Sequence, residues 1–431
     1  MSSGAELIRA FVAGRYRDPA SGVAVACPIR VIAVEDSLAG EEAELVARAG
    51  LTGTLAVVAD PATHEALGGR VQRALRGSRG IVLERPRGDD ATVAALRERV
   101  GSADGLVAVG SGTINDLVKA VAHDSGRPCA VFATAASMNG YTTSTVSLTR
   151  GGFKVSSQAK APVGVFFDLD VLRAAPPRLA AAGLGDSLCR SPAQIDWRLA
   201  DRLLGTGYSE TPFDLQKADE PILLARAAGL RTADRAAMRA LVHILVLTGL
   251  GVCVTGTSHH GSMGEHLISH YVDMFARPHP GSLHGEQVGV ASLVMRRLQD
   301  RVLRAARAPE LRPLPLDEEA LRRRYGPAAA ACAAELAGKA LDASACDRVN
   351  AWLDAHWDEL RAELLEVAIA PESLAAALRA AGAPTRGADL GLPAAFWRDA
   401  IRHAREVRNR FSMLDVAAHA GLLDDFVAGE A

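Results

Sequence analysis

The six cysteines of this chain form no Cys-x-x-Cys pair. They are Cys27, Cys129, Cys189, Cys253, Cys332 and Cys346. This usage is typical of reduced thiols, so we expect a cytoplasmic protein. The first twenty residues carry charges at Glu6, Arg9, Arg15 and Arg17 and have no long apolar core, so a secretory signal is not expected.

Long apolar runs and dense basic runs are also missing. The most apolar helical segment, residues 240–251, is interrupted by His243 and ends in Gly-Leu-Gly, which argues against a membrane span. The densest basic run, residues 322–324, follows the acidic residues 317–319, a pattern typical of a solvated helix face. The formal net charge is only −2. We therefore expect neither a nucleic acid nor a membrane as a partner.

The chain is long enough for two domains, because 431 residues exceed what one hydrophobic core usually organises. Its first half alternates short apolar runs with helical patterns, which predicts a doubly wound parallel sheet flanked by helices. The predicted strands are residues 31–34, 53–58, 80–83, 106–109 and 130–133. The predicted helices between them are residues 40–49, 63–75 and 91–100. Residues 142–168 are expected to form an extended, hydroxyl-rich hairpin region, and from about Asp170 onward the pattern is helical.

A glycine-rich turn carries the first functional signal. The apolar residues 106–109 lead into Gly110-Ser-Gly112-Thr113, and an amphipathic helix follows. Gly110 and Gly112 permit positive φ and a close backbone approach, and Thr113 offers a hydroxyl, so the turn is a candidate cradle for a pyrophosphate. Two glycines also occur in such turns for steric reasons alone, and both interpretations stay open at this point.

Ligands of doubly wound sheets bind at the carboxyl ends of the strands. This rule places Asp60, residues 110–113 and residues 134–137 along one crevice. Asp60 is positioned to accept a hydrogen bond from a ribose hydroxyl, which favours NAD, although an aspartate after a strand is also a common turn residue.

Residue types suited to a metal follow in the second half. Asp186 comes after a flexible Gly-Leu-Gly turn, His266 and His270 lie four residues apart on one predicted helical face, and His284 is nearby in the sequence. Zinc, iron(II) and nickel all accept imidazole and carboxylate ligands, and a catalytic site keeps one position open for substrate. A single histidine is more often a surface or hydrogen-bonded residue than a ligand, so the clustering carries the hypothesis.

In most of its length the chain resembles the glycerol-1-phosphate dehydrogenase branch of the iron-containing alcohol dehydrogenase and glycerol dehydrogenase superfamily. The matching motifs are Val58-Ala-Asp60, Gly110-Ser-Gly-Thr-Ile-Asn-Asp116, Thr134-Ala-Ala-Ser-Met-Asn-Gly-Tyr141, Gly152-Phe-Lys154, Gly185-Asp186, Asp196-Trp197, Glu265-His266, Leu283-His-Gly-Glu-Gln-Val288 and Val407-Arg-Asn-Arg-Phe-Ser-Met-Leu-Asp415. Their order and spacing together carry the resemblance.

The resemblance implies a fold, a cofactor and a metal. The implied fold is that of dehydroquinate synthase and the iron-containing alcohol dehydrogenases: an α/β dinucleotide-binding domain, residues 1–169, followed by an all-α metal- and substrate-binding domain, residues 170–431. Asp186, His266 and His284 match the metal ligands, with zinc expected first and nickel or iron as alternatives. The implied partners are NAD or NADP, a phosphorylated small-molecule substrate, and further copies of the chain in a homo-oligomer, a dimer or larger.

The implied reaction is hydride transfer between a nicotinamide and a carbinol carbon whose oxygen is bound by the metal. The implied dinucleotide-binding residues are Asp60, Gly110, Ser111, Gly112, Thr113, Asp116, Thr134 and Ser137. Asn139 is expected to orient the substrate, Lys154 to pair with an anionic group, and His270 to orient substrate or relay a proton. The competing interpretation of Lys154, His259, His260 and His270 is a surface lysine and solvated or capping imidazoles.

Two departures from the family pattern concern the substrate. Asn139 stands where the family usually has aspartate, and an amide cannot take a proton. The usual Arg-Pro-Ala-Ser-Gly run appears here as residues 259–263, His-His-Gly-Ser-Met, which replaces a guanidinium by imidazoles. Either these changes are neutral or the substrate differs, in which case the paired imidazoles would impose a pH dependence between about 6 and 7.5.

Two other functions stay open. A sugar-phosphate cyclase of the dehydroquinate-synthase kind also uses NAD and a metal, but Asp186 stands where such lyases typically have glutamate. A catalytically silent relative is suggested by Asn139, although the retained Asp186, His266 and His284 argue against it.

Overall fold

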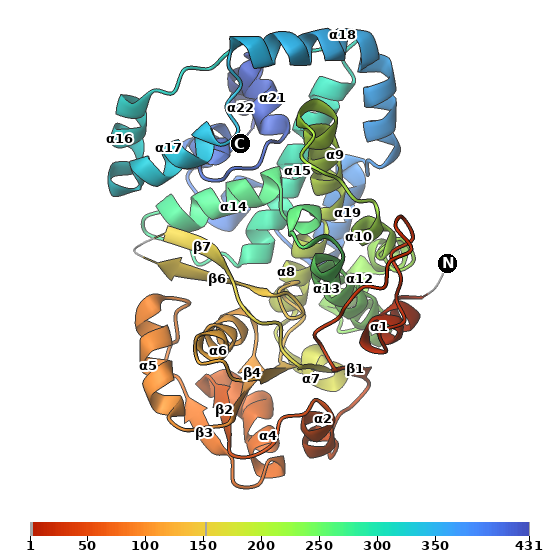
Figure 1. The fold of residues 1–431 in the computed structure, drawn as a ribbon, viewed down its shortest axis with the longest axis vertical. Helices are drawn as coiled ribbons and strands as arrows, with labels where there is room; N and C mark the ends of the chain where they lie inside the picture. The colour runs from red at the N-terminus through yellow and green to blue at the C-terminus, as the bar shows by residue number, and fades with distance from the viewer. Residues whose placement is uncertain (1–2, 151–152, 431) are drawn as a thin grey trace. The chain divides into compact units, whose positions relative to one another are not determined.

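The computed structural model describes residues 3–150 and 153–430, which form two compact units (Figure 1). The sheet unit comprises Met1–Ser187, Glu210–Thr257 and Ala380–Gly382, and the helical unit comprises Leu188–Ser209, Ser258–Arg379 and Ala383–Ala431. The chain therefore passes between the units more than once, and residues 170–187 and 210–257 group with the sheet. The functional division at residues 169 and 170 stays a prediction.

A six-stranded parallel sheet, in the order β1-β8-β5-β4-β2-β3, forms the centre of the sheet unit. The strands are β1 (Val31–Glu35), β2 (Leu55–Ala59), β3 (Arg79–Val82), β4 (Gly105–Gly110), β5 (Cys129–Ala133) and β8 (Gly164–Asp168). All five predicted strands are present, and the predicted parallel sheet is confirmed. β8 differs from the expectation, because its residues were assigned to the hairpin region although they pair between β1 and β5.

The interior strands are apolar because both of their faces are covered. Every residue of β4, β5 and β8 is buried, which is typical of a parallel sheet with helices on both sides. The helices that follow the strands are α2 (Glu42–Arg48), α3 (Pro61–Thr63), η1 (His64–Gly68), α4 (Gly69–Ala74), α5 (Asp90–Val100) and α6 (Gly112–Asp124). An antiparallel hairpin, β6 (Thr145–Arg150) and β7 (Phe153–Gln158), lies beside α6.

Further helices complete the sheet unit: α1 (Gly4–Val12), α7 (Leu169–Ala174), α8 (Pro177–Ser187), α10 (Thr211–Asp214), α11 (Glu220–Ala225), α12 (Ala227–Arg231) and α13 (Arg235–Thr255). By length and apolar composition α13 is able to cross a membrane, but 83% of its most apolar window is buried inside the protein. A core helix of a globular protein has the same properties.

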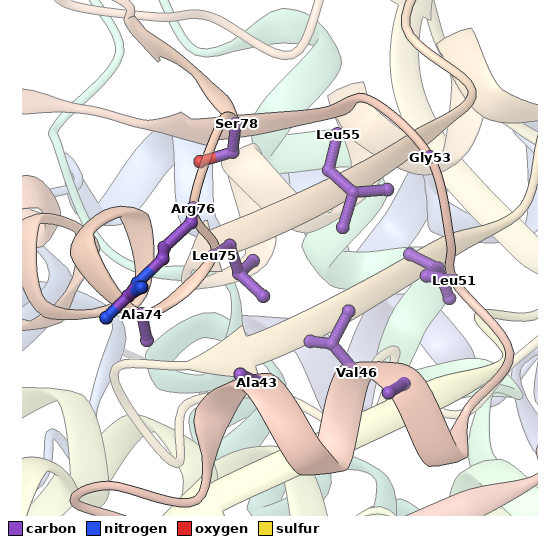
Figure 2. A pocket seen from close by; sticks show the side chains of 10 residues that line it. Ala43, Val46, Leu51, Gly53, Leu55, Ala74, Leu75, Arg76 and Ser78 are labelled. Atoms are coloured by element: carbon purple, nitrogen blue, oxygen red, sulfur yellow. The ribbon is translucent and has the colours of Figure 1, made fainter.

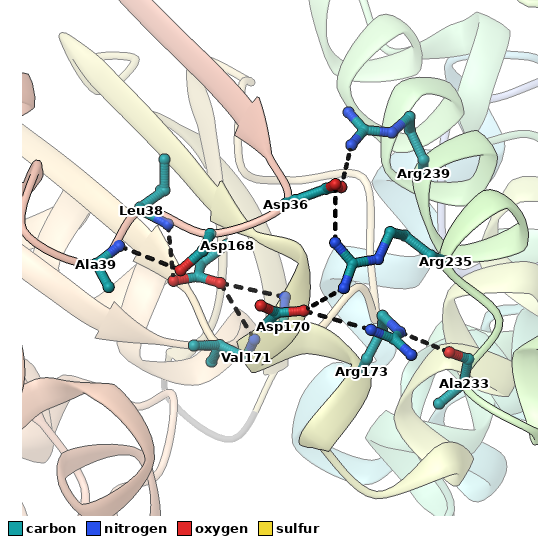
Figure 3. Close-up of polar contacts among 11 residues, drawn as sticks. Asp36, Leu38, Ala39, Asp168, Asp170, Val171, Arg173, Ala233, Arg235 and Arg239 are labelled. Carbon is teal, nitrogen blue, oxygen red and sulfur yellow. Dashed lines mark hydrogen bonds and ion pairs between the residues drawn. The ribbon is translucent and has the colours of Figure 1, made fainter.

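Ion pairs connect the start of α13 to the carboxyl ends of β1 and β8 (Figure 3). Asp36 pairs with Arg235 at 2.8 Å and with Arg239 at 2.5 Å, and Arg235 also pairs with Asp170 at 2.8 Å. These side chains are largely exposed, so solvent screens the pairs and they contribute little to stability. The buried apolar residues of α13 therefore supply most of its attachment, and the ion pairs orient it.

The helical unit contains α9 (Arg190–Leu204), η2 (His259–Gly261), α14 (Gly264–Phe275), α15 (His284–Leu303), α16 (Glu318–Tyr325), η3 (Gly326–Ala328), α17 (Ala329–Ala337), α18 (Ala343–Glu366), most of α19 (Pro371–Ala381), η4 (Gly387–Leu390), α20 (Ala394–His403), η5 (Ala404–Glu406), α21 (Met413–His419) and α22 (Leu423–Ala428). The helices α14 and α15 pack against each other and against α9. The predicted helical character of the second half is confirmed.

A close backbone approach inside the sheet unit brings α8 against the segment after β5. A Cβ atom at Gly183 would lie 1.8 Å from the carbonyl oxygen of Ala136, so only glycine fits there. One turn later on the same helix, Asp186 Oδ2 accepts a hydrogen bond from the backbone N–H of Asn139 at 2.8 Å. The missing side chain at Gly183 thus sets the position of a buried carboxylate.

We predict that Gly183→Ala destabilises the protein by about 1–3 kcal/mol, since the new methyl group meets backbone atoms that cannot rotate away. The measurement is the free energy of unfolding in denaturant. Gly88→Ala is the matched control, because a Cβ atom there meets its nearest neighbour, in Leu148, at an ordinary 3.5 Å. Equal stabilities of the two variants would contradict the close approach.

Candidate functional site

The glycine-rich turn joins β4 to α6 at the carboxyl edge of the sheet. Ser111 precedes the first helical residue, and its side chain makes no capping hydrogen bond. The first turn of α6 also contains no acidic residue, so the positive end of the helix dipole is not offset within that turn. An uncapped helix start after a buried strand is suited to bind an anion.

The structural reason for Gly110 and Gly112 differs from the predicted one, which was a positive φ angle. Neither Gly110 nor Gly112 has a positive φ, so backbone freedom does not explain them. A Cβ atom at Gly110 would lie 2.6 Å from that of Ile114, whereas one at Gly112 would meet only Met138, at 3.6 Å and 3.8 Å. Gly110 is therefore required for packing, while Gly112 leaves the surface of the turn open.

Predicted dinucleotide-binding residues, among them Thr134, Asp60 and Asp116, make hydrogen bonds within the protein. The N–H of Thr134 donates to the carbonyl of Gly110 at 3.1 Å. Asp60 caps α3 by accepting from the N–H of Thr63 at 2.9 Å, and Asp116 accepts from the N–H of Ser147 at 3.0 Å. The capping of α3 agrees with the interpretation of Asp60 as a turn residue. A contact between Asp60 and a ribose stays a prediction.

A buried lysine holds the segment that follows Asn139 by hydrogen bonds. Lys119 of α6 donates from Nζ to the carbonyl oxygens of Gly140 at 3.0 Å and Thr145 at 2.7 Å, and to Thr143 Oγ1 at 3.2 Å. Burial lowers the pKa of this lysine. A role for Lys119 was not predicted, although a lysine among the apolar positions of an amphipathic helix is a signal for a buried polar contact.

In the helical unit, three imidazoles gather on α14 and at the start of α15. The ring centres of His266 and His284 are 5.1 Å apart, and His270 lies 6.0 Å from His266 and 6.4 Å from His284. His266 and His270 are only 5% and 6% exposed, so the solvated interpretation of His270 is wrong. The predicted four-residue spacing on one helical face thus brings these rings together, and α15 adds the third.

Hydrogen bonds at Nδ1 indicate which ring nitrogen carries the proton in two of these histidines. His266 Nδ1 lies 2.9 Å from Glu265 Oε1, and a carboxylate accepts, so this nitrogen carries the proton. His284 Nδ1 lies 3.2 Å from Ser269 Oγ, whose own proton is donated to Gln287 Oε1 at 2.8 Å. The serine oxygen must then accept from His284. Both rings consequently keep an Nε2 lone pair, as metal-binding histidines do when a second group orients them.

Cys189, Glu265 and His266 also lie close together, with one potential ligand atom from each within 4.8 Å of the others. Glu265 Oε1 already accepts from the N–H of Met263 at 2.8 Å as well as from His266. The carboxylate therefore orients the His266 ring, and this arrangement favours a supporting role for Glu265 over direct ligation.

The Asp196-Trp197 motif supports the histidines from α9. Asp196 accepts hydrogen bonds from the N–H groups of Gly264 at 3.2 Å and Met413 at 3.1 Å, and from Gln299 Nε2 at 2.8 Å. Burial, with Glu265 as a negative neighbour, raises the pKa of Asp196 to about 7. A role for Asp196 was not predicted, because nothing in the sequence shows that these distant segments meet.

The paired histidines of η2 are partly or fully covered. The ring of His259 stacks on Trp197 with centres 5.7 Å apart, and His260 is 1% exposed. Burial lowers the pKa of His259 to about 4, and the positive charge of Arg410 adds to this shift. The expected pH dependence between about 6 and 7.5 is therefore wrong for His259, which stays neutral through that range. Lys154 lies on β7, but its side chain is outside the described part of the chain.

A pocket at the other edge of the sheet is not part of this arrangement (Figure 2). It is lined by Leu51, Gly53 and Leu55 at the start of β2, by Val46 of α2, and by Leu75 after α4. The glycine-rich turn follows the carboxyl end of β4, which is parallel to β2, so the pocket lies at the opposite end of the strands. Most of its lining residues are apolar, with Arg76 and Ser78 as the polar ones, so it offers no carboxylate, imidazole or thiol for a metal.

Comparisons with known proteins agree with the geometry. Residues 33–176 match the family model of the iron-containing alcohol dehydrogenases. The chain is 32% identical over 277 residues to a glycerol-1-phosphate dehydrogenase [NAD(P)+] from Thermococcus kodakarensis, covering 62% of this chain and 76% of the relative. It is 28% identical to the enzyme of that name from Bacillus velezensis, with 84% of each chain covered.

Solved structures share the fold. Glycerol dehydrogenase from Schizosaccharomyces pombe is 16% identical, with a TM-score of 0.59 over 93% of this chain and 90% of the other. Maleylacetate reductase from Agrobacterium tumefaciens is 18% identical, with a TM-score of 0.61 over 94% and 97%. At these identities the likeness concerns the fold alone, and it confirms the expected fold.

We predict that Gly112→Val raises the Kd for NAD(P)H at least about tenfold while leaving the melting temperature within a few degrees of wild type. The side chain projects from an open part of the turn, so it obstructs a bound pyrophosphate more than it disturbs packing. Fluorescence titration measures the Kd, and Gly88→Val serves as the control. An unchanged Kd would place the cofactor elsewhere.

Proposed function

This chain belongs to the glycerol-1-phosphate dehydrogenase branch of the iron-containing alcohol dehydrogenases, and on that premise we propose that it interconverts dihydroxyacetone phosphate and glycerol 1-phosphate. The broader activity is that of a metal-dependent, NAD(P)-linked oxidoreductase acting on a polyol phosphate. The names of the relatives favour this reaction over the ring closure of a sugar-phosphate cyclase and over a catalytically silent protein.

The observation that carries the proposal is the fixed orientation of two imidazoles. His266 and His284 each donate from Nδ1 to an acceptor, so Nε2 carries the lone pair that each ring would offer to a divalent cation. We propose Asp186 as the carboxylate ligand, because it is 1% exposed, is held by the N–H of Asn139, and matches the family pattern. Two imidazoles and one carboxylate suit zinc, and they also suit iron(II) or nickel.

When bound, such a cation lowers the pKa of the substrate oxygen and stabilises the negative charge that develops on it. The nicotinamide supplies or accepts the hydride. The residues of the chain then bind and orient: the start of α6 holds the pyrophosphate, and Asn139 hydrogen-bonds the substrate. His270, whose pKa burial lowers well below its usual value, is neutral and fits a role as hydrogen-bond partner of the substrate.

Further details rest on the sequence and the family. We propose zinc as the metal, a homo-oligomeric assembly, a cytoplasmic location, and Lys154 as a partner for an anionic group. Asp60, Ser111, Thr113, Asp116, Thr134 and Ser137 are proposed as the remaining dinucleotide contacts.

We predict that His266→Ala loses most of its bound metal and most of its activity. Removal of one ligand from a three-ligand site leaves the ion weakly held, by about ten- to hundredfold or more in affinity. Elemental analysis of the purified variant measures the metal directly. His356→Ala is the control, since His356 is exposed and stacks on Trp352. Full occupancy in His266→Ala would overturn the ligand assignment.

Substrate preference is tested with a panel of phosphorylated and unphosphorylated polyols and ketones, assayed with NAD(H) and NADP(H). We predict that wild type prefers the phosphorylated pair and that Asn139→Ala lowers kcat/KM for both ketones about tenfold, because it removes the amide that hydrogen-bonds the substrate. Asn139→Asp restores the residue usual in the family, so it should keep the preference for the phosphorylated pair while the added negative charge changes kcat/KM. Identical profiles of wild type and Asn139→Asp would show that this departure is neutral.

A further inference from the structure

Positively charged and imidazole side chains from separate segments meet in the helical unit. Arg408 and Arg410 lie between η5 and α21, His259 lies in η2, and His270 lies in α14. Burial and then the charges of Arg408, of the nearby metal-site imidazoles and of Arg410 lower the pKa of His270. Arg410 also lowers the pKa of His259. Arg410 also donates hydrogen bonds on both sides of His259, to Ser258 Oγ and to the carbonyl of Ser262, and we call these four residues the cationic cluster.

The hydrogen bonds that the structure describes for Arg410 go to neutral acceptors. One of its guanidinium nitrogens donates to the backbone carbonyl of Ser262, and another donates to Ser258 Oγ at 2.8 Å. Burial lowers the pKa of Arg410 to about 10, and Arg408 adds to this shift, while Glu265 and Glu335 oppose it. The guanidinium of Arg410 is thus covered by protein. Among the described contacts, it donates no hydrogen bond to a carboxylate.

Two imidazole nitrogens of the cluster have no partner in the described part of the chain. Nδ1 of His259 and Nδ1 of His270 are both buried, and neither has a hydrogen bond within residues 3–150 and 153–430. A buried polar atom without a partner destabilises the folded protein unless a ligand or water satisfies it. These nitrogens point to a bound group that hydrogen-bonds to them.

The segment that carries the two arginines is firmly held. Asp415 is fully buried and pairs with Lys339 at 3.0 Å, while its Oδ1 accepts from Arg405 Nε at 3.0 Å. Lys339 Nζ also donates to the carbonyl of Arg410 at 2.9 Å, and the N–H of Asn409 donates to Glu335 Oε2 at 2.5 Å. The guanidinium of Arg410 is therefore presented from a fixed backbone.

Arg410 reaches the loop in which this chain has no arginine of its own. Residues 259–263 read His-His-Gly-Ser-Met, and the guanidinium of Arg410 is hydrogen-bonded to both ends of the segment from Ser258 to Ser262. Guanidinium groups bind phosphate through several donors in a planar fork, which an imidazole cannot do. The guanidinium that contacts this loop is therefore that of Arg410, in the C-terminal segment of the chain.

We propose that Arg410, with Arg408, binds the phosphate group of the substrate, and that His259 and His270 supply further hydrogen bonds from Nδ1. This inference rests on the proposed function, because it names the groups that would recognise a phosphorylated polyol. A phosphate dianion offsets the charge of the two arginines and gives the buried imidazole nitrogens a partner.

Paired measurements separate the phosphate site from the reaction itself. The first is kcat/KM for dihydroxyacetone phosphate and for dihydroxyacetone, and the second is the Kd of inorganic phosphate for the metal-loaded enzyme by calorimetry. Arg410→Met should lower the ratio of the two kcat/KM values about ten- to hundredfold and weaken phosphate binding by a similar factor. Arg410→Lys should give a smaller loss of both, since it retains the charge without the fork.

Arg402→Met is the matched control, because Arg402 pairs with the exposed Asp399 and Asp424 and lies outside the cationic cluster. If Arg410→Met does not fold, Arg410→Lys and Arg408→Met test the proposal instead. For these variants the same ratio of kcat/KM values and the same Kd of phosphate are measured. Equal losses for both substrates with an unchanged phosphate Kd would overturn the proposal. If wild type binds phosphate through Arg410 but does not turn over dihydroxyacetone phosphate, the anion site stands and the proposed function fails.

Discussion

One buried carboxylate, Asp196, connects the segments on which the imidazoles of the helical unit depend. It accepts from the first residue of α14, from Gln299 of α15 and from the first residue of α21, while it is itself part of α9. His266 lies two residues after the α14 contact, and His284 lies at the start of α15. The placement of the two rings therefore depends on a residue that is not one of the proposed metal ligands. Its pKa of about 7 shows how strongly burial opposes the charge.

In the sheet unit the corresponding constraint is steric. Gly183 and Gly249 allow α8 and α13 to approach the segment between Ala136 and Thr142, since a Cβ atom at Gly249 would lie 2.8 Å from the carbonyl oxygen of Asn139. Lys119 then fixes the same segment from α6 by three hydrogen bonds. Asn139 is consequently held by backbone packing and a buried ammonium group, whatever its own side chain binds.

The alternation of apolar runs and helical patterns was enough to predict five of the six parallel strands. It was not enough for β8, whose Gly-Val-Phe-Phe-Asp sequence follows a hydroxyl-rich region and was grouped with it. The histidines His266, His270 and His284 could be predicted as a cluster because helical spacing is readable in a sequence. Asp196, Lys119 and Arg410 could not, since their partners lie about 20 to 220 positions away and only tertiary packing brings them together.

The two departures from the family pattern have different physical meanings. His259 replaces a cation by a ring that stacks on Trp197 and is neutral near pH 7, so the loop itself contributes no positive charge at that position. Arg410 donates to the same loop from the tail segment, so a guanidinium is present there without an arginine in the loop. Asn139 has no such replacement in the described contacts. Its backbone N–H is bound to Asp186, and exchanging aspartate for asparagine changes the side-chain charge without changing that hydrogen bond. The His259 change therefore removes one positive charge from the loop, whereas the Asn139 change removes one negative charge beside a buried carboxylate.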